Sequence, residues 1–247
     1  MKVLKLGGSL LEQPEALSAL FQSLKQSNDD TLLVHGGGAL VQQWLAKADL
    51  HSEKQDGLRV SPEPHMPYIV GGLAGAANKT LMKYAIAGGI KPVGITLYEA
   101  GIHCVQQSDT LGQVGACQFS EGEASPRFIS DLLAQGYVPI VSSIGFSENG
   151  EWFNVNADDA SVAVAALYSA DLLFLTDVEA VLDGSGNPLS HLTSDSIQEL
   201  TQNGVIKDGM LVKVRAALEA EKRLRRCVRI GSWNLMSNPH SGTQISE

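Results

Sequence analysis

The sequence has little positive charge and no long apolar run. Its 247 residues carry 18 Lys and Arg against 27 Asp and Glu, which gives a formal net charge of −9. This balance argues against nucleic acid or an anionic membrane as a partner, because phosphate groups attract basic patches. No run approaches the roughly 20 apolar residues that span a bilayer, and the first residues lack the apolar stretch of a secretory signal. We therefore expect a cytoplasmic protein that binds neither nucleic acid nor membrane.

Cysteine is scarce and histidine shows no metal-binding pattern. Cys104, Cys117 and Cys227 are far apart in the sequence and lack Cys-x-x-Cys spacing, so zinc and redox chemistry have little support. We interpret them as reduced packing residues. The six histidines show neither His-x-x-x-His nor His-Glu-x-x-His spacing. We therefore predict no metal site built by the protein itself.

Short runs rich in β-branched residues and leucine alternate with segments of helical length. This alternation predicts an α/β fold, a three-layer αβα sandwich around a mostly parallel open sheet. The predicted strands are Val3–Leu6, Thr31–Val34, Pro92–Leu97, Val138–Ser142, Asp171–Thr176 and Val228–Gly231. The predicted helices are Pro14–Lys25, Ala39–Ala48, Ala74–Ala87, Pro126–Ala134, Ala157–Tyr168 and Met210–Leu224.

Other segments interrupt this pattern. Shorter strands between Gly101 and Phe119, and around Phe146–Phe153, are typical of hairpins that form a lid or a side sheet. Ser52–Pro67 is a polar loop. A weak boundary after Ala170 divides the chain into a predicted N-terminal lobe, 1–170, and a C-terminal lobe, 171–247.

Two predicted strands end in glycine-rich turns that lead into helical segments. The first is Lys5-Leu6-Gly7-Gly8-Ser9 and the second is His35-Gly36-Gly37-Gly38. Glycines at such turns let an anion approach the backbone N–H groups, and the following helix N-terminus favours negative charge. Taken alone, each glycine pair is at least as consistent with a simple tight turn as with anion binding. Two such turns in one sheet favour phosphate or carboxylate binding.

The common nucleotide signatures are absent. Gly71–Thr80 resembles a P-loop only until Asn78 takes the place of the required second glycine, and no Gly-x-Gly-x-x-Gly occurs. A Walker-type ATPase and a Rossmann dehydrogenase are therefore disfavoured. We interpret Gly71–Ala77 as a small-residue helix start against which another element packs closely.

Three further segments carry polar residues that are candidates for ligand binding or catalysis. Arg59, in Gly-Leu-Arg-Val, is a natural bidentate partner of a carboxylate or phosphate, although a lone arginine is usually a surface charge. Asn154-Val155-Asn156-Ala157-Asp158 precedes an alanine-rich segment and holds more polar residues than a helix cap requires. Lys213 follows Gly209 by about one helical turn, where it opposes the helix dipole unless an anion binds there.

Together these segments resemble the amino acid kinase family from about Lys2 to the C-terminus. The motifs that carry the resemblance are Lys-Leu-Gly-Gly at 5–8, His-Gly-Gly-Gly at 35–38, Gly-Leu-Arg-Val at 57–60, Val-Ser-Ser-Ile-Gly at 141–145, Asn-Val-Asn-Ala-Asp at 154–158 and Asp-Gly-Met-Leu-Val-Lys at 208–213. The resemblance implies the amino acid kinase fold and a kinase that uses ATP with nucleotide-bound Mg²⁺.

The resemblance also implies roles for single residues. Lys5 and Lys213 would flank the transferring phosphoryl group, and Asp158 would orient both lysines. An acylated amino acid would lie against the amides of Gly37 and Gly38, with its α-carboxylate near Arg59 and Asn154. The segments expected to contact the nucleotide are Gly7 and Gly8 at its phosphates, and Asp177, Val178, Glu179, Ala180, Val181, Leu182, Val205, Ile206 and Lys207 at adenine and ribose.

Within the family, the resemblance implies phosphorylation of the side-chain carboxylate of N-acetyl-L-glutamate in arginine biosynthesis. Acetylaminoadipate, or an amino acid attached to a carrier, remains open as the substrate, because sequence does not show pocket shape. A catalytically silent metabolite sensor is the alternative of another class, although Lys5, Lys213 and Asp158 are all present. The chain begins almost at its first strand, whereas arginine-inhibited members carry an extra N-terminal helix. The resemblance therefore implies a homodimer that arginine does not inhibit.

Overall fold

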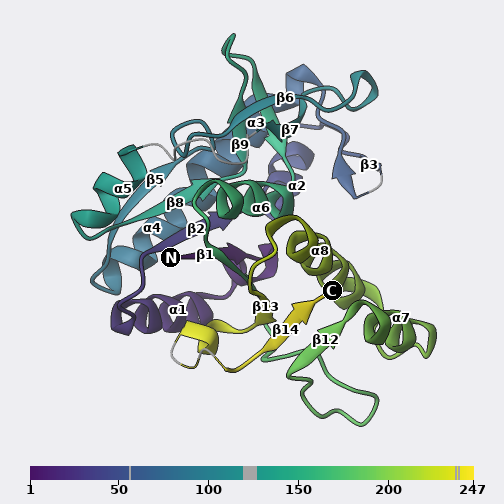
Figure 1. The fold of residues 1–247 in the computed structure, drawn as a ribbon. Helices are drawn as coiled ribbons and strands as arrows, with labels where there is room; N and C mark the ends of the chain where they lie inside the picture. The colour runs from purple at the N-terminus through teal and green to yellow at the C-terminus, as the bar shows by residue number, and fades with distance from the viewer. Residues whose placement is uncertain (56, 119–126, 237, 239) are drawn as a thin grey trace.

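The structure is a computed structural model of the chain and describes residues 1–55, 57–118, 127–236, 238 and 240–247. Its centre is an eight-stranded sheet (Figure 1). The strand order is β12 (His191–Thr193), β14 (Thr243–Ser246), β13 (Val228–Gly231), β11 (Asp171–Leu175), β1 (Lys2–Leu6), β2 (Thr31–His35), β8 (Tyr137–Ser142) and β5 (Lys91–Ile95).

Most neighbouring strands of this sheet are parallel. β14 is antiparallel to β13, and β12 pairs with β14 in parallel, so β12 at the edge and its neighbour β14 run against the other six strands. The predicted mostly parallel α/β sheet is therefore confirmed. The predicted boundary between the two lobes lies after Ala170, just before β11. The sheet is continuous there, because β11 pairs with β1 along its whole length.

Helices cover both faces of the sheet. One face packs against α5 (Arg127–Ala134), α6 (Ala157–Leu167) and α8 (Asp208–Leu224), and the other packs against α1 (Pro14–Gln26) and α4 (Asn78–Ala87). The predicted three layers are confirmed. The helix predicted from Pro126 is described from Arg127, because residue 126 lies outside the described residues.

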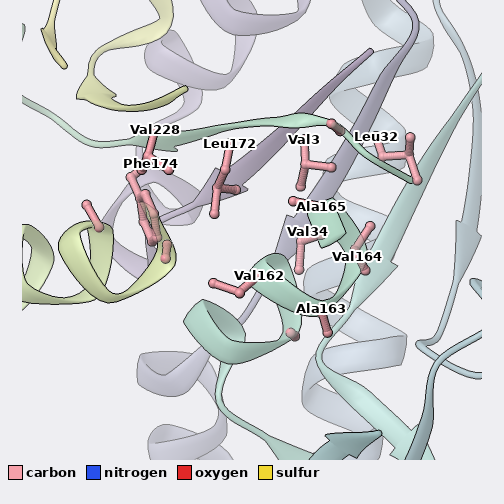
Figure 2. Packing of buried hydrophobic residues seen from close by; sticks show 14 of the residues in the cluster. Val3, Leu32, Val34, Val162, Ala163, Val164, Ala165, Leu172, Phe174 and Val228 are labelled. Carbon is pink, nitrogen blue, oxygen red and sulfur yellow. The ribbon is translucent and has the colours of Figure 1, made fainter. Parts of the chain in front are cut away.

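Alternation along β1 determines which side chains meet which helices. Leu4 and Leu6 belong to the core beneath α1, whereas Val3 belongs to the core beneath α6. Figure 2 shows Val3 and Val34 lying close to Val162–Ala165 of α6. Successive side chains of a strand point to opposite faces, so Lys5 shares the face of Val3 and points toward α6.

The helix expected from Ala74 begins earlier than the sequence predicts. Helical backbone runs from α3 (Met66–Val70) through a π-helical segment, Gly71–Ala77, into α4. A Cβ at Gly72 would lie 3.0 Å from Val41 on α2 (Gly38–Lys47). Gly71–Ala77 is thus a close packing surface for another helix, as predicted, but it lies in the middle of a helical run. Proline at position 67 marks the true start, at a position where its missing N–H costs little.

Four short strands form a separate small barrel at the top of Figure 1. They are β6 (His103–Gln106), β7 (Val114–Gln118), β9 (Ile144–Phe146) and β10 (Trp152–Val155). The predicted hairpin strands therefore form a side sheet, with Phe119 outside the described residues. Cys104 and Cys117 lie directly opposite each other on β6 and β7, although both remain free thiols.

Several short elements have no counterpart among the predicted ones. The polar loop at 52–67 contains a hairpin of β3 (Lys54–Gln55) and β4 (Leu58–Arg59). Near the C-terminus, β12 and β14 extend the sheet, and the helix α7 (Ser194–Gln202) follows β12. β3, β4 and β12, with two or three residues each, are too short for hydrophobic periodicity to reveal. In the described part of the chain, no helix is both long and apolar enough to cross a bilayer.

Candidate active site

A cavity of about 320 Å³ opens beyond the carboxyl ends of β1 and β2. Open α/β sheets place ligands at this edge. The cavity brings together residues that are far apart in the sequence. Its lining includes the predicted residues Lys5, Gly8, Gly37, Gly38, Arg59, Asn154 and Asp158, together with Leu6, Gly36, Val41, Lys54, Gly57, Leu58, Leu73, Val114, Ser143, Val155, Asn156 and Ala157.

Lys5 and Asp158 form an ion pair inside this cavity. The Nζ of Lys5 lies 2.7 Å from Oδ1 of Asp158, and the two side chains are 15% and 29% exposed. Lys5 reaches Asp158 because it faces α6, whose first turn holds the carboxylate. Its Nζ also lies 5.9 Å from the centre of the Phe174 ring. The ammonium group is therefore held at the cavity wall with its donors directed by neighbouring groups.

The glycines of the two turns differ in whether they line the cavity. Gly7 donates its N–H to the carbonyl of Leu175 over 3.3 Å, so this amide is already engaged. Gly8 starts a short 3₁₀ helix (Gly8–Glu12), and nothing lies within 4 Å of a Cβ built on it. In the second turn, Gly37 precedes α2 and Gly38 begins it. Gly8, Gly37 and Gly38 therefore line the cavity directly, whereas Gly7 shapes the turn.

Arg59 is nearly buried and lacks an anionic partner within the described part of the chain. It is 9% exposed, and its guanidinium donates to Gln42 Oε1 at 2.8 Å, to the carbonyl of Gly38 at 2.9 Å and to Ser52 Oγ. All three acceptors are neutral. Burial lowers the pKa of Arg59, yet an arginine stays charged at physiological pH. The cavity therefore contains an uncompensated positive charge that favours a carboxylate.

The polar residues before α6 have three separate contacts. Asn156 is the N-cap, and its Oδ1 accepts the N–H of Asp158 at 2.7 Å. Asn154 donates from Nδ2 to Ser61 Oγ at 3.0 Å, and Asp158 pairs with Lys5. Asn156 caps the helix, whereas Asn154 and Asp158 make contacts elsewhere. This explains why the motif holds more polar residues than a helix start requires.

Lys213 lies on α8, outside the lining of the cavity. Its Nζ donates to Thr176 Oγ1 at 2.6 Å and lies 3.7 Å from Oδ1 of Asp177. Among the described residues, Asp158 contacts Lys5 but forms no ion pair with Lys213. Of the two contacts expected for Asp158, the structure shows the one with Lys5, and its role in orienting the lysines stays a prediction. Lys213 contacts Thr176 and Asp177 instead, because the residues after β11 are the ones that face the start of α8.

Thr176 links Lys213 to Asp177. Its hydroxyl accepts from Lys213 and donates to Asp177 Oδ1 at 2.8 Å. The hydrogen bond from Thr176 and the charge of Lys213 hold the pKa of Asp177 below its ordinary value. Thr176 was missing from the predicted site, because it looked like the last residue of a buried strand. Its position between that strand and an acidic loop is the only sequence signal for it.

The residues predicted near adenine and ribose lie around the same end of β11. Ala180, Val181 and Ile206 are buried, whereas Leu182 is 48% exposed and Lys207 is exposed at the N-cap of α8. Gly184 and Val205 are neighbours, since a Cβ at Gly184 would lie 3.5 Å from the Val205 side chain. The loop that continues from 177–182 thus reaches the segment 205–207, which leads into α8.

The donors at this site suit a phosphorylated ligand better than a metal held by the protein. The described residues contain no cluster of three or more His, Cys, Asp or Glu side chains arranged to hold a metal ion. The amide of Gly8, which has no acceptor among the described residues, the ammonium groups of Lys5 and Lys213, and the start of α8 are donors of the kind that phosphate oxygens accept. These residues fit the phosphate groups of a nucleotide.

The fold and this set of lysines and glycine amides define an α/β protein built to hold anionic groups at one edge of its sheet. The chain belongs to the amino acid kinase family, whose sequence model matches residues 1–232. It is 44% identical over 256 residues to acetylglutamate kinase of Aeromonas salmonicida, a match that covers 99% of this chain and 97% of the relative.

Solved structures agree on the fold. A crystal structure from Streptococcus mutans UA159 superposes with a TM-score of 0.78 at 27% identity, covering 99% of this chain and 98% of that one. Carbamate kinase of Giardia superposes with a TM-score of 0.67 at 16% identity, covering 99% and 98%. At that low identity the second likeness concerns the fold alone.

Proposed function

We propose that the protein transfers the γ-phosphoryl group of ATP to the side-chain carboxylate of N-acetyl-L-glutamate. The products are N-acetyl-L-glutamyl 5-phosphate and ADP, and the reaction is the second step of arginine biosynthesis. The observation that carries the proposal is the single cavity that unites Lys5, Gly8, Gly37, Gly38, Arg59, Asn154 and Asp158. The 44% identity to acetylglutamate kinase over nearly the whole chain supports the same substrate.

Arg59 and Asn154 are the proposed partners of the α-carboxylate. Arg59 is held by neutral acceptors, so its positive charge is available to an anionic ligand. A planar guanidinium binds a carboxylate through two parallel hydrogen bonds, which fixes both position and orientation. The amides of Gly37 and Gly38 are the proposed donors to the side-chain carboxylate that accepts the phosphoryl group.

The nucleophile requires no general base in this proposal. A glutamate side chain, with a reference pKa of about 4.3, is already ionised at neutral pH. The obstacle is the repulsion between two anions. Lys5 and Lys213 would reduce it by placing positive charge on either side of the transferring group, so the protein contributes mainly position and electrostatics. Asp158, which forms an ion pair with Lys5, would hold the ammonium group in place in the cavity.

ATP supplies the phosphoryl group and carries the Mg²⁺ that neutralises part of its charge. Gly8 would donate to the nucleotide phosphates. Asp177, Val178, Glu179, Ala180, Val181, Leu182, Val205, Ile206 and Lys207 would surround adenine and ribose. In this proposal, residues 1–170 form the lobe that binds the acylated amino acid, and residues 171–247 form the lobe that binds the nucleotide. Gly8 would contact the nucleotide phosphates from the first lobe.

We also propose a cytoplasmic homodimer. The surface suggested for self-association is the helical run that ends in α4, since Ile86 on that helix is 61% exposed. Sedimentation analysis, together with an Ile86→Lys variant, tests the assembly independently of the activity.

The reaction itself is tested by measuring ADP release with Mg·ATP and three acceptors. N-acetyl-L-glutamate, N-acetyl-L-aminoadipate and free L-glutamate are compared, with hydroxylamine present to trap an acyl phosphate as its hydroxamate. Preference for N-acetyl-L-glutamate with trapped hydroxamate is the expected result. Preference for the aminoadipate derivative would change the substrate, and no turnover with any acceptor would favour a sensor that binds without catalysis.

A further inference from the structure

The first histidine of the His-Gly-Gly-Gly motif is fully buried and outside the chemistry described so far. His35 is the last residue of β2, and its side chain is 0% exposed. Its Nδ1 lies 2.7 Å from the carbonyl oxygen of Gly36, and its Nε2 lies 3.0 Å from Nδ2 of Asn78 on α4. A buried imidazole with two close partners has a defined protonation state, which the partners determine.

The two partners of His35 allow only one tautomer. The Gly36 carbonyl can only accept, so Nδ1 must carry the proton. The Asn78 amide nitrogen donates, because it also lies 2.9 Å from the carbonyl of Ile140, and Nε2 must therefore accept. Burial, with a smaller effect from the charge of Lys79, lowers the pKa of His35 to about 4, although its hydrogen bond to the Gly36 carbonyl acts in the opposite direction. The ring is thus neutral, with its single proton on Nδ1.

The hydrogen bond from Nδ1 sets the orientation of the next peptide group. The Gly36 carbonyl and the Gly37 N–H belong to one trans peptide, in which the two groups point in opposite directions. Because the carbonyl points back to the His35 ring, the Gly37 N–H points away from that ring. Within the described part of the chain this N–H has no acceptor, and Gly37 lines the cavity.

We propose that His35 is a positioning residue that aims the Gly37 amide at the acceptor carboxylate, with Asn78 fixing its tautomer. Asn78 is 1% exposed, and its Nδ2 contacts both His35 Nε2 and the carbonyl of Ile140 on β8. These contacts hold the imidazole in one orientation. A donor held in place before binding loses little entropy when the ligand arrives. This inference rests on the proposed function of the cavity.

Two variants separate positioning from simple packing. An asparagine at 35 retains a donor where Nδ1 lies but loses the contact with Asn78, whereas a glutamine retains an acceptor where Nε2 lies but loses the bond to Gly36. Each variant leaves one buried group unpaired, so we expect a similar fall in Tm. His35→Gln should raise the KM for N-acetyl-L-glutamate about tenfold, the effect of one hydrogen bond, and His35→Asn should change it less than twofold. Equal KM values in the two variants would overturn the proposal.

The wild-type protein provides a test that needs no variant to fold. Nitrogen-15 NMR of the His35 ring should show the neutral Nδ1–H tautomer at pH 6 and still at pH 5. Adding N-acetyl-L-glutamate should shift the Gly37 amide resonance while the tautomer stays the same. A ring protonated on Nε2, or a Gly37 resonance that does not move although turnover is measured, would refute the role of His35. Absence of turnover in the wild type would instead refute the proposed function.

Discussion

The cavity beyond β1 and β2 and the region around the start of α8 hold their charged groups in different ways. In the cavity, Arg59 is 9% exposed and the Lys5 side chain 15% exposed, and both are fixed by short hydrogen bonds or an ion pair. At α8, the Lys213 side chain is 34% exposed and that of Asp177 is 48% exposed. The charged side chains of the cavity are held in place before a ligand binds, whereas those near α8 are more exposed and would become fully ordered only when a ligand binds.

This difference indicates which kinetic constants Arg59 and Lys213 should control. Arg59 would bind the ground-state carboxylate and contribute to KM, because its geometry is complete in the free protein. A more exposed charge that meets the phosphoryl group during transfer contributes to kcat, because its interaction is strongest in the transition state. The predictions below test this division, from the largest expected effect to the smallest.

Replacing Lys213 by alanine should produce the largest loss. We expect kcat to fall on the order of 10² to 10³-fold with a smaller change in KM, because the removed charge stabilises the charge that develops on the phosphoryl group. Steady-state kinetics with N-acetyl-L-glutamate measure both constants. Lys222→Ala, in the last turn of the same helix, serves as the control. A near-normal kcat in Lys213→Ala would remove this residue from the mechanism.

Replacing Arg59 by alanine should act on binding. We expect the KM for N-acetyl-L-glutamate to rise on the order of 100-fold with a modest change in kcat, because a desolvated charge–carboxylate contact is lost. Isothermal calorimetry of substrate binding gives the same comparison without turnover. Arg59→Lys keeps the charge but not the paired donors, so its KM should be intermediate. If the alanine variant kept its KM, the α-carboxylate would have to bind elsewhere.

Thr176→Val tests whether the link between Lys213 and Asp177 directs the lysine. Valine has a similar shape but removes the hydroxyl that accepts from Lys213 and donates to Asp177. We expect kcat to fall about tenfold, the effect of one hydrogen bond to a charged group. The matched control is Thr201→Val, which removes an intrahelical hydroxyl on α7. Equal kcat values in the two variants would show that Lys213 needs no guide.

Asp177 should contribute a small, acid-sensitive part of stability. Its folded-state pKa is lowered, so its contribution is present above the ordinary value of 3.8 and is lost as the pH falls through the folded-state pKa. Since the side chain is about half exposed, solvent screening limits this contribution to a few tenths of a kcal/mol. Urea unfolding at pH 6 and pH 3 should show a slightly larger loss in the wild type than in Asp177→Asn. An equal loss would contradict it.

Much of the fold was predictable because its signals are local. Each of the six predicted strands corresponds to an observed strand, with ends that differ by no more than two residues, since Val3–Leu6 and Val228–Gly231 are runs of apolar residues bounded by turns. The start of the long helix was placed eight residues late, at Ala74 instead of Met66. Glycines at 71 and 72 looked like the edge of a helix, but they are packed beneath α2, a contact that only the tertiary structure reveals.

The sequence by itself determined the α/β pattern, the glycine turns and the chemical types available for holding anions, because periodicity and turn chemistry act over a few residues. Only the tertiary structure decided which groups meet. It brought Lys5 to Asp158 across 153 positions, placed Thr176 between Lys213 and Asp177, and set Cys104 opposite Cys117. Such contacts depend on strand order and register, and these follow from the packing of the whole sheet.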